Sequence, residues 1–333
     1  MFLSVSRRTD IPAFYSDWFF KRVDAGFLYV RNPMNFHQVS KINLSQNLID
    51  CIVFWTKDPS KIISKLDLLD KQGYRYYFQI TINDYGGEIE RNTPGLKYTL
   101  KSFKDLSNKI GNLKTIWRYD PIILSERLTL DYHIEKFTNI AKELKGYAKR
   151  CVISFLDIYS RTEKKLEYLK LKEISEKDME IIAEKFSIIA EKNGLEIFTC
   201  SEKIDLKKYG VKHGKCIDDE LFYKIFKVSV NVKKDNTQRK ECGCVKSVDI
   251  GAYNTCENGC LYCYANFNDG LKNTNIKIHN PLSPFLFGGK EAGDKINERK
   301  MESFIKEEDN NNNSKKSCDD GKKIKLFLLN SDE

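Results

Sequence analysis

The sequence contains no apolar run that approaches the roughly 20 residues needed to span a membrane. Its start, Met1–Arg8, has no charged-then-apolar leader, which predicts a cytoplasmic protein without a secretory signal or a membrane partner. No strand-like segment is followed by G-x-G-x-x-G or G-x4-G-K-[ST], so the phosphate loops of nucleotide-binding folds are missing. The chain has four histidines, which are scattered, so histidines are weak candidates for a metal site.

Cysteine, in contrast, is plentiful, with ten residues in a chain of 333. Without an export signal, these cysteines argue against a disulfide scaffold and favour reduced thiols, several of them bound to metal. The formal net charge of +9 is compatible with a nucleic-acid partner. The lysines are spread through amphipathic segments, however, so a solvated basic surface explains this charge more simply.

Strand-like and helix-like segments alternate along the first two-thirds of the chain. Helices are predicted after Asp58-Pro59, over residues 129–148, and from a capping-box start at Ser175 to a stop at Gly194. Six β/α units predict an α/β fold, either a partial TIM-like (β/α) barrel or an open doubly wound sheet, and we expect the barrel. Its strands should be the six runs that are almost continuously apolar, as in parallel sheets buried on both faces. They are Phe2–Val5, Cys51–Thr56, Tyr74–Ile82, Thr115–Tyr119, Cys151–Leu156 and Leu195–Thr199.

The composition divides the chain into three parts. Residues 1–230 are predicted to form the barrel. Residues 231–290 are rich in cysteine and glycine and are predicted to form an iron–sulfur segment packed on it, with a short strand over Val245–Tyr253. Residues 291–333 are predicted to be a tail, disordered around 307–323, where asparagine and mixed charges dominate.

Polar side chains gather where the predicted strands end. Because the carboxyl ends of barrel strands share one face, these side chains could line a pocket for a charged cofactor and substrate. In a simpler alternative, Asp58 and Asp120 cap the helices that follow, and the arginines pair with them. The candidate catalytic residues are Arg7, Arg8, Asp10, Lys57, Arg118, Asp120 and Glu202.

The most specific motif is C-x3-C-x2-C at Cys256, Cys260 and Cys263. Three thiolates on one loop can hold three irons of a [4Fe–4S] cluster and leave the fourth iron open to a ligand. Gly259 lets the loop wrap closely around a cluster, and Tyr262 places an aromatic ring beside it. The alternative is a zinc site completed by another cysteine, although paired C-x2-C arms are more typical of zinc.

Four more cysteines lie in polar loops rather than in the apolar runs where inert core thiols are expected. They are Cys200, Cys216, Cys242 and Cys244. These four could bind a second closed cluster or a zinc ion, or one of them could complete the first cluster. Cys51 and Cys151 open apolar strands and are expected in the core, and Cys318 lies in the predicted tail.

The segment from Gly251 to Ala265 resembles the radical S-adenosylmethionine superfamily, and most closely its spore photoproduct lyase branch. There too a strand leads into C-x3-C-x2-C, and the last cysteine is followed by Tyr-Ala. The resemblance implies a [4Fe–4S] cluster, S-adenosylmethionine bound beside Tyr262 and Tyr264, and an electron donor such as a flavodoxin or ferredoxin. It also implies reductive cleavage of S-adenosylmethionine, followed by radical chemistry on a substrate that the sequence does not identify.

The whole chain resembles a bacterial family catalogued as domain of unknown function 1848, through stretches that span most of residues 1–290. That family has a cysteine cluster likened to the cluster of the radical enzymes. The matching stretches are Ser6–Tyr15, Val53–Pro59, Trp117–Pro121, Cys200–Leu206, Gly214–Asp218, Gln238–Ile250 and the cysteine loop.

In the radical superfamily the cysteine loop usually follows the first strand, whereas here it follows six β/α units. A strand over Val245–Tyr253 beside Phe2–Val5 would restore the strand order, so we expect a permuted radical S-adenosylmethionine barrel. Two other functions fit: an electron-transfer or redox-sensing iron–sulfur protein without cofactor cleavage, and a zinc-stabilised barrel that binds nucleic acid. In a permuted barrel, the cysteine loop should open on the same face as Arg7, Lys57, Arg118 and Glu202.

Overall fold

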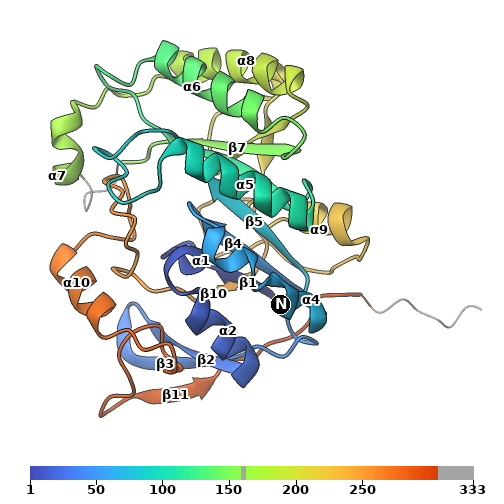
Figure 1. Cartoon of the computed structure of the whole chain (residues 1–333), viewed down its shortest axis with the longest axis vertical. Coiled ribbons are helices and arrows are strands. Elements are labelled where there is room, and N and C mark those ends of the chain that lie inside the picture. The colour runs from blue at the N-terminus through green and yellow to red at the C-terminus, as the bar shows by residue number, and fades with distance from the viewer. Residues whose placement is uncertain (159–162, 307–333) are drawn as a thin grey trace, which may run out of the picture.

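The structure, a computed structural model, describes residues 1–158 and 163–306. Its centre is a sheet of eight strands in the order β10-β1-β4-β5-β6-β7-β8-β9 (Figure 1). Every pairing in this sheet is parallel, so the carboxyl ends of the strands lie on one side. The strands are β1 (Phe2–Val5), β4 (Cys51–Thr56), β5 (Tyr76–Thr81), β6 (Thr115–Ile122), β7 (Arg150–Phe155), β8 (Glu196–Cys200), β9 (Lys212–Gly214) and β10 (Ser247–Asp249).

The predicted α/β class is confirmed, and each of the six predicted strands has a counterpart in this sheet. β9 has no predicted counterpart, because its three residues lie in a polar stretch without an apolar pattern. In the described residues β9 and β10 each have one neighbouring strand, so the sheet is open at both edges.

β10 lies beside β1, where the sequence analysis places a strand. Phe2 and Ser4 of β1 are in parallel register with Ser247 and Asp249. β10 is shorter than the predicted Val245–Tyr253, because the Asp249 carboxylate accepts a hydrogen bond from Gly251 N and turns the chain out of the sheet.

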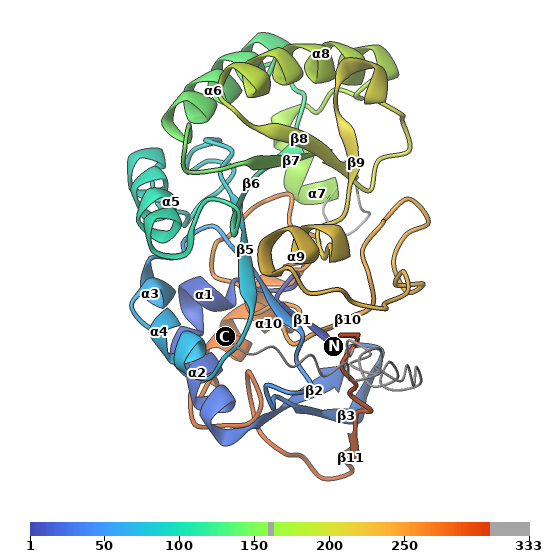
Figure 2. The same cartoon turned by 90° about the vertical axis from the view of Figure 1, so that its right-hand side faces the viewer.

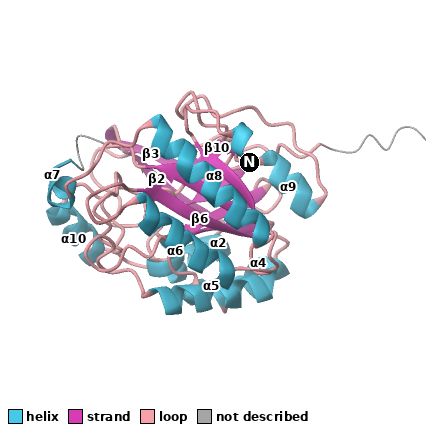
Figure 3. Ribbon diagram, turned by 90° about the horizontal axis from the view of Figure 1, so that it is seen from above, coloured by secondary structure: helices cyan, strands magenta, loops and turns pink. Residues whose placement is uncertain are grey.

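Helices cover both faces of the sheet. α5 and α9 lie on opposite sides of β5 (Figure 2), and α6 and α8 pack side by side (Figure 3). No helix in the described part of the chain is long and apolar enough to cross a membrane. The helices are α1 (Ile11–Phe14), α2 (Ser16–Ala25), α3 (Ser60–Ile63), α4 (Leu66–Lys71), α5 (Leu96–Ile110), α6 (Leu130–Glu143), α7 (Glu163–Leu166), α8 (Glu176–Lys192), α9 (Asp219–Phe226) and α10 (Asp269–Lys277), with 3-10 turns at Glu167–Leu169 and Lys207–Tyr209.

Two predicted helix starts can be compared with the structure. The capping box is confirmed, because Ser175 Oγ accepts from Asp178 N at 3.2 Å and Ser175 N donates to the Asp178 carboxylate at 3.0 Å. The helix after Asp58 begins at Ser60, and Pro59 is its N-cap. Asp58 still caps this helix, as predicted, because its Oδ1 accepts from Ser60 N at 2.9 Å.

Alternate side chains along the strands are buried in two separate cores. One core, which includes Leu3 and Phe54, packs against helices that include α6 and α8. The other, which includes Phe2 and Tyr77, packs against α9 and the segments that lead into it. Cys51 and Cys151 are fully buried in these cores, as predicted.

A smaller sheet, which the sequence analysis does not predict, lies below the main one in Figure 1. It consists of β2 (Phe27–Asn32), β3 (Asn35–Asn43) and β11 (Lys295–Glu298), in the order β11-β3-β2. β2 and β3 form an antiparallel hairpin, and β11 runs parallel to β3. Residues 295–298 of the predicted tail thus form a strand that pairs with β3. The disorder predicted around 307–323 lies outside the described residues.

Candidate functional site

A cavity of about 960 Å³ lies at the carboxyl ends of the strands. Its walls come from the ends of β1, β4, β6 and β8, from the cysteine loop after β10, and from β2 and β3 of the small sheet. The predicted site residues line it with one exception, Glu202. Those that line it are Arg7, Arg8, Asp10, Lys57, Arg118, Asp120, Tyr262, Tyr264 and the seven candidate metal-binding cysteines.

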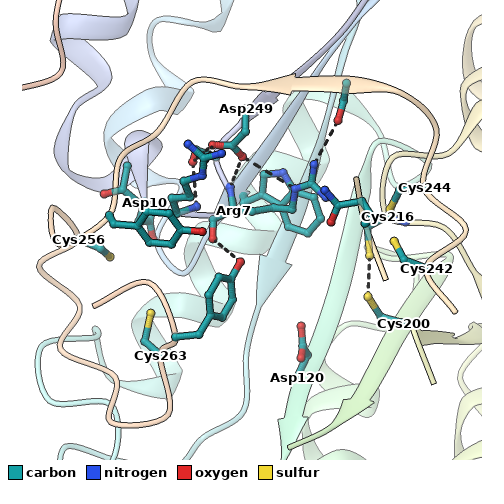
Figure 4. A pocket seen from close by; sticks show the side chains of 18 of the residues that line it. Arg7, Asp10, Asp120, Cys200, Cys216, Cys242, Cys244, Asp249, Cys256 and Cys263 are labelled. Carbon is teal, nitrogen blue, oxygen red and sulfur yellow. Dashed lines mark hydrogen bonds and ion pairs between the residues drawn. The ribbon is translucent and has the colours of Figure 1, made fainter. Parts of the chain in front are cut away.

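The cysteines form two sets on opposite walls of this cavity, with Arg7 and Asp120 between them (Figure 4). The first set, here called the loop cysteines, contains Cys256, Cys260 and Cys263. The second set, here called the edge cysteines because they adjoin the edge strands of the sheet, contains Cys200, Cys216, Cys242 and Cys244.

Asp249, the last residue of β10, ties the start of the cysteine loop to the end of β1. Its carboxylate accepts hydrogen bonds from Ser4 Oγ at 2.7 Å, from Ser6 Oγ at 2.8 Å and from Arg7 N at 2.8 Å. The Nε atoms of Arg7 and Arg8 both lie 3.9 Å from this carboxylate. Asp249 therefore positions both arginines at the cavity. The sequence analysis does not identify this role, because only the position of Asp249 shortly before the cysteine motif points to it.

Gly251 allows the cysteine segment to pass close to β1. A Cβ atom at this position would lie 2.7 Å from Ser6 Cβ, and Ser6 is itself buried. We expect Gly251→Ala to force the two segments apart and to lower the free energy of unfolding by about 1–3 kcal/mol. Urea unfolding measures this change.

Gly289→Ala is the matched control, because no atom lies within 4 Å of a Cβ built there. Its effect should stay within about 0.5 kcal/mol. Equal stabilities of the two variants would contradict the close contact between Gly251 and Ser6.

Asp10 joins the end of β4 to the cysteine loop. Its Oδ2 accepts from Lys57 N at 2.8 Å and from Asn258 Nδ2 at 3.0 Å, and its Oδ1 accepts from Ala13 N at 3.1 Å. Burial raises the pKa of Asp10, against the hydrogen bonds that lower it. Because Asn258 lies between two loop cysteines, Asp10 fixes the position of the loop.

Lys57 and Glu90 form a buried ion pair next to the loop cysteines, with 2.8 Å between Lys57 Nζ and Glu90 Oε1. Glu90 also accepts hydrogen bonds from Asn83 Nδ2 at 3.1 Å and from the hydroxyl of Tyr262. Burial lowers the pKa of Lys57, but the charges of Glu90 and of the Cys260 thiol raise it overall. Glu90 belongs to no motif and lies in an irregular segment after β5, so the sequence analysis does not identify it.

Arg118 lies between Asp120 and the edge cysteines. Its Nε donates to Asp120 Oδ2 at 2.9 Å, and its Nη1 donates to Cys216 Sγ at 2.9 Å. Asp120 also accepts from Ser154 Oγ. Burial raises the pKa of Asp120, but Arg118 and Ser154 together lower it further, so the net shift is downward. Asp120 caps no helix, since it lies within β6 and the next helix is capped by Thr129, so the capping alternative is wrong for this residue.

Glu202 lies near the cavity but does not line it. Its carboxylate accepts from Phe155 N at 2.9 Å. Burial raises the pKa of Glu202 to about 7, with Asp157 and Asp120 adding to the rise. Glu202 is therefore placed to support the end of β7 rather than to touch a bound molecule.

The two tyrosines of the cysteine motif have different surroundings. Tyr262 is partly buried at the cavity wall, with its ring 6.3 Å from that of Tyr85. Tyr264 is partly exposed at the cavity, and its hydroxyl donates to Arg7 O at 3.0 Å. Both rings therefore line the cavity, but the Tyr262 hydroxyl is held by Glu90, whereas Tyr264 is the more exposed of the two.

The three loop cysteines line the same cavity. Cys256 and Cys260 are buried and Cys263 is partly buried, and burial raises the pKa of each, to about 12 for Cys256. The charges of Asp10 and Cys263 add to this rise in the pKa of Cys256. Backbone hydrogen bonds from Ala265 and Asn266 act in the opposite direction and lower the pKa of Cys263.

Two of the edge cysteines are in direct contact, and a third, Cys244, accepts a hydrogen bond from Cys216 N at 3.3 Å. The Sγ atoms of Cys200 and Cys216 are 3.2 Å apart. The neighbouring Cys244 lowers the pKa of Cys242 to about 7, against burial, which raises it. In residues 1–158 and 163–306, however, no group of three or more His, Cys, Asp or Glu side chains is already arranged to hold a metal ion.

Comparisons with known proteins identify the family of this chain. No curated protein matches it. Among solved structures, the crystal structure of a "putative alpha-L-fucosidase" from Bacteroides thetaiotaomicron VPI-5482 is similar over 71% of this chain and 84% of that chain, at 12% identity. The TM-score of that pair is 0.23, so it supports no conclusion on fold or activity. The family described as "Domain of unknown function (DUF1848)" matches residues 2–265, in agreement with the resemblance seen in the sequence, and the chain belongs to this family.

Proposed function

We propose that the chain is a radical S-adenosylmethionine enzyme that acts on a substrate still to be identified. The observation that carries this proposal is the position of the loop cysteines, which face the same cavity as Arg7, Lys57 and Arg118. When bound, a [4Fe–4S] cluster would supply the electron that cleaves S-adenosylmethionine. A donor such as a flavodoxin or ferredoxin would provide that electron.

The loop cysteines suit such a cluster. A cubane is held by thiolates that stand apart around it, and these three thiols come from one loop and line one cavity. The other cysteines at the cavity, within the described residues, form a separate contacting set on the opposite wall. A cluster on the loop would thus keep an iron without a protein thiolate.

The strand order also suits the proposal. β10 precedes the cysteine loop and pairs with β1, which restores the order expected for a permuted partial barrel. The open sheet would then correspond to an incomplete (β/α) barrel whose active face lies at the carboxyl ends of the strands.

Residues around the cavity would bind and orient the cofactor and substrate. Arg7 and Arg8 lie along one wall, and a carboxylate is the partner that guanidinium groups bind best. Tyr264 adds a ring and a hydroxyl at the same wall. β2 and β3 cover the cavity from the other side and would limit the access of water during the reaction.

Anaerobic reconstitution with iron and sulfide, followed by dithionite and S-adenosylmethionine, tests the proposal. We expect 5′-deoxyadenosine to form, as measured by liquid chromatography with mass spectrometry. Omitting dithionite should stop its formation, since the cleavage consumes an electron.

A reducible cluster that yields no 5′-deoxyadenosine would contradict the proposal and favour an electron-transfer protein. A protein that holds only zinc and binds nucleic acid in a salt-dependent manner would favour the third function considered above.

A further inference from the structure

The edge cysteines bring four thiols together from three separate segments of the chain. Besides the 3.2 Å contact between the Cys200 and Cys216 sulfurs, the backbone N–H groups of Cys216 and Ile217 donate to Cys244 Sγ at 3.3 Å and 3.4 Å. Cys242 lies two residues before Cys244 and lines the same wall of the cavity. Three of the four are buried, in the same apolar cluster as Phe2 and Tyr77, although their sequence surroundings are polar.

These thiols lie where the two edges of the main sheet come together. Cys200 is the last residue of β8, and Cys216 follows β9, which is one edge of the sheet. Cys242 and Cys244 precede β10, which is the opposite edge. A group bound to all four sulfurs would therefore join the two edges that the backbone leaves unpaired in the described residues.

We propose that the four edge cysteines bind one divalent metal ion of the zinc type, in a closed tetrathiolate site that joins the β9 and β10 sides of the sheet. This site is distinct from the loop cysteines, and it does not depend on any chemistry of S-adenosylmethionine.

The sulfur separations favour a single ion over a second cluster. With metal–sulfur bonds of about 2.3 Å, tetrahedral geometry places the ligand sulfurs about 3.8 Å apart. The Cys200–Cys216 contact of 3.2 Å is close to that value, whereas a cubane requires its thiolates to stand well apart around a larger body.

The thiols need little movement to surround an ion. The Cys200 and Cys216 sulfurs are in contact, and Cys244 Sγ accepts from Cys216 N, but the four sulfurs do not yet enclose a common centre. A change of χ1 rotamer moves a sulfur without moving the backbone. Rotation of the Cys200 and Cys242 side chains can therefore bring the four sulfurs into a tetrahedral arrangement.

The backbone that carries these thiols is held in place by the core. The carbonyl oxygen of Cys216 accepts from Tyr77 hydroxyl at 2.8 Å and from Gln79 Nε2 at 3.0 Å, both on β5. The segment of Cys244 is tied to the same loop, because Val245 N donates to Ile217 O at 3.1 Å. Two of the three segments are thus prearranged, which favours binding.

The surrounding charge also suits the site. Four thiolates around a divalent ion carry a net charge of −2, which requires compensation in a buried position. Arg118 Nη1 lies 2.9 Å from Cys216 Sγ, and the two N–H donors to Cys244 add further stabilisation. Arg118 would therefore be a positioning and charge-balancing residue for the metal.

Metal binding to the full chain tests the proposal. A variant with Cys256, Cys260 and Cys263 all changed to alanine removes the loop thiols, and its reduced, metal-free form is titrated with Co²⁺ and then Zn²⁺. We expect one Co²⁺ per chain with the visible and sulfur-to-metal absorption bands of a tetrahedral tetrathiolate, displaced by one Zn²⁺. Adding Cys244→Ser to this variant should weaken Zn²⁺ binding at least about tenfold.

Cys51→Ser in the same background is the control, because Cys51 is a buried cysteine outside the edge set, and it should leave the Co²⁺ spectrum unchanged. Three results would overturn the proposal: no tetrathiolate spectrum, an iron–sulfur cluster on the edge cysteines of the same variant after reconstitution, or a Cys200–Cys216 disulfide in protein purified under reducing conditions. The spectrum of the triple variant is decisive even if Cys244→Ser fails to fold.

Discussion

Serine at Cys256, Cys260 or Cys263 should each abolish the [4Fe–4S] cluster, with iron falling from about four atoms per chain to below one after anaerobic reconstitution. The three thiols come from one loop and face one volume, so the loss of any one leaves an iron without its ligand. The iron and sulfide content and the absorbance near 400 nm would measure this loss, and 5′-deoxyadenosine formation should fall with it.

The control is serine at Cys244, which lies on the opposite wall of the cavity. If the two sets are separate, Cys244→Ser should keep the cluster absorbance. A loss of the cluster in Cys244→Ser as complete as that in Cys260→Ser would show instead that an edge cysteine completes the first cluster.

Glu90→Gln should destabilise the protein by about 3 kcal/mol, because it leaves the Lys57 ammonium buried without an opposite charge. The side chains of this pair are only 12% and 7% exposed, so water cannot replace the lost partner. Urea unfolding of the protein without metal would measure the change in the free energy of unfolding.

Glu88→Gln is a matched control two residues away. Glu88 pairs with Arg127 at the surface, where the two side chains are 63% and 77% exposed, so its loss should cost less than about 0.5 kcal/mol. A double variant, Lys57→Met with Glu90→Gln, should regain part of the stability, because no unpaired charge remains. Equal effects of Glu90→Gln and Glu88→Gln would contradict the account of a buried pair.

The main sheet could be predicted because its strands are buried on both faces. Runs such as Cys51–Thr56 are apolar at almost every position, and this pattern depends only on local sequence. β2 and β3 were harder to detect, because most of their residues are only partly buried or exposed and mix polar with apolar side chains. β11 has only four residues, and its partner lies more than 250 positions earlier in the chain, so nothing local indicates the pairing.

The candidate site shows the same division between local and distant signals. The loop cysteines have a spacing that can be recognised in the sequence, and the polar strand ends follow from the parallel sheet. Glu90 holds Lys57 and Asp249 holds the end of β1, but each acts through contacts that only folding creates. Residues in such roles carry no spacing rule, so the sequence does not single them out.

The electron paramagnetic resonance spectrum of the reduced cluster, recorded before and after adding S-adenosylmethionine, tests the central claim most directly. An iron without a protein thiolate can bind the cofactor, so we predict a clear change in the g-values and line shape of the wild-type protein on addition. S-adenosylhomocysteine, which lacks the sulfonium charge and cannot be cleaved in the same way, gives a reference for binding without reaction. A reduced [4Fe–4S] spectrum that is identical with and without S-adenosylmethionine would mean that no open iron faces the cavity, and would contradict the account.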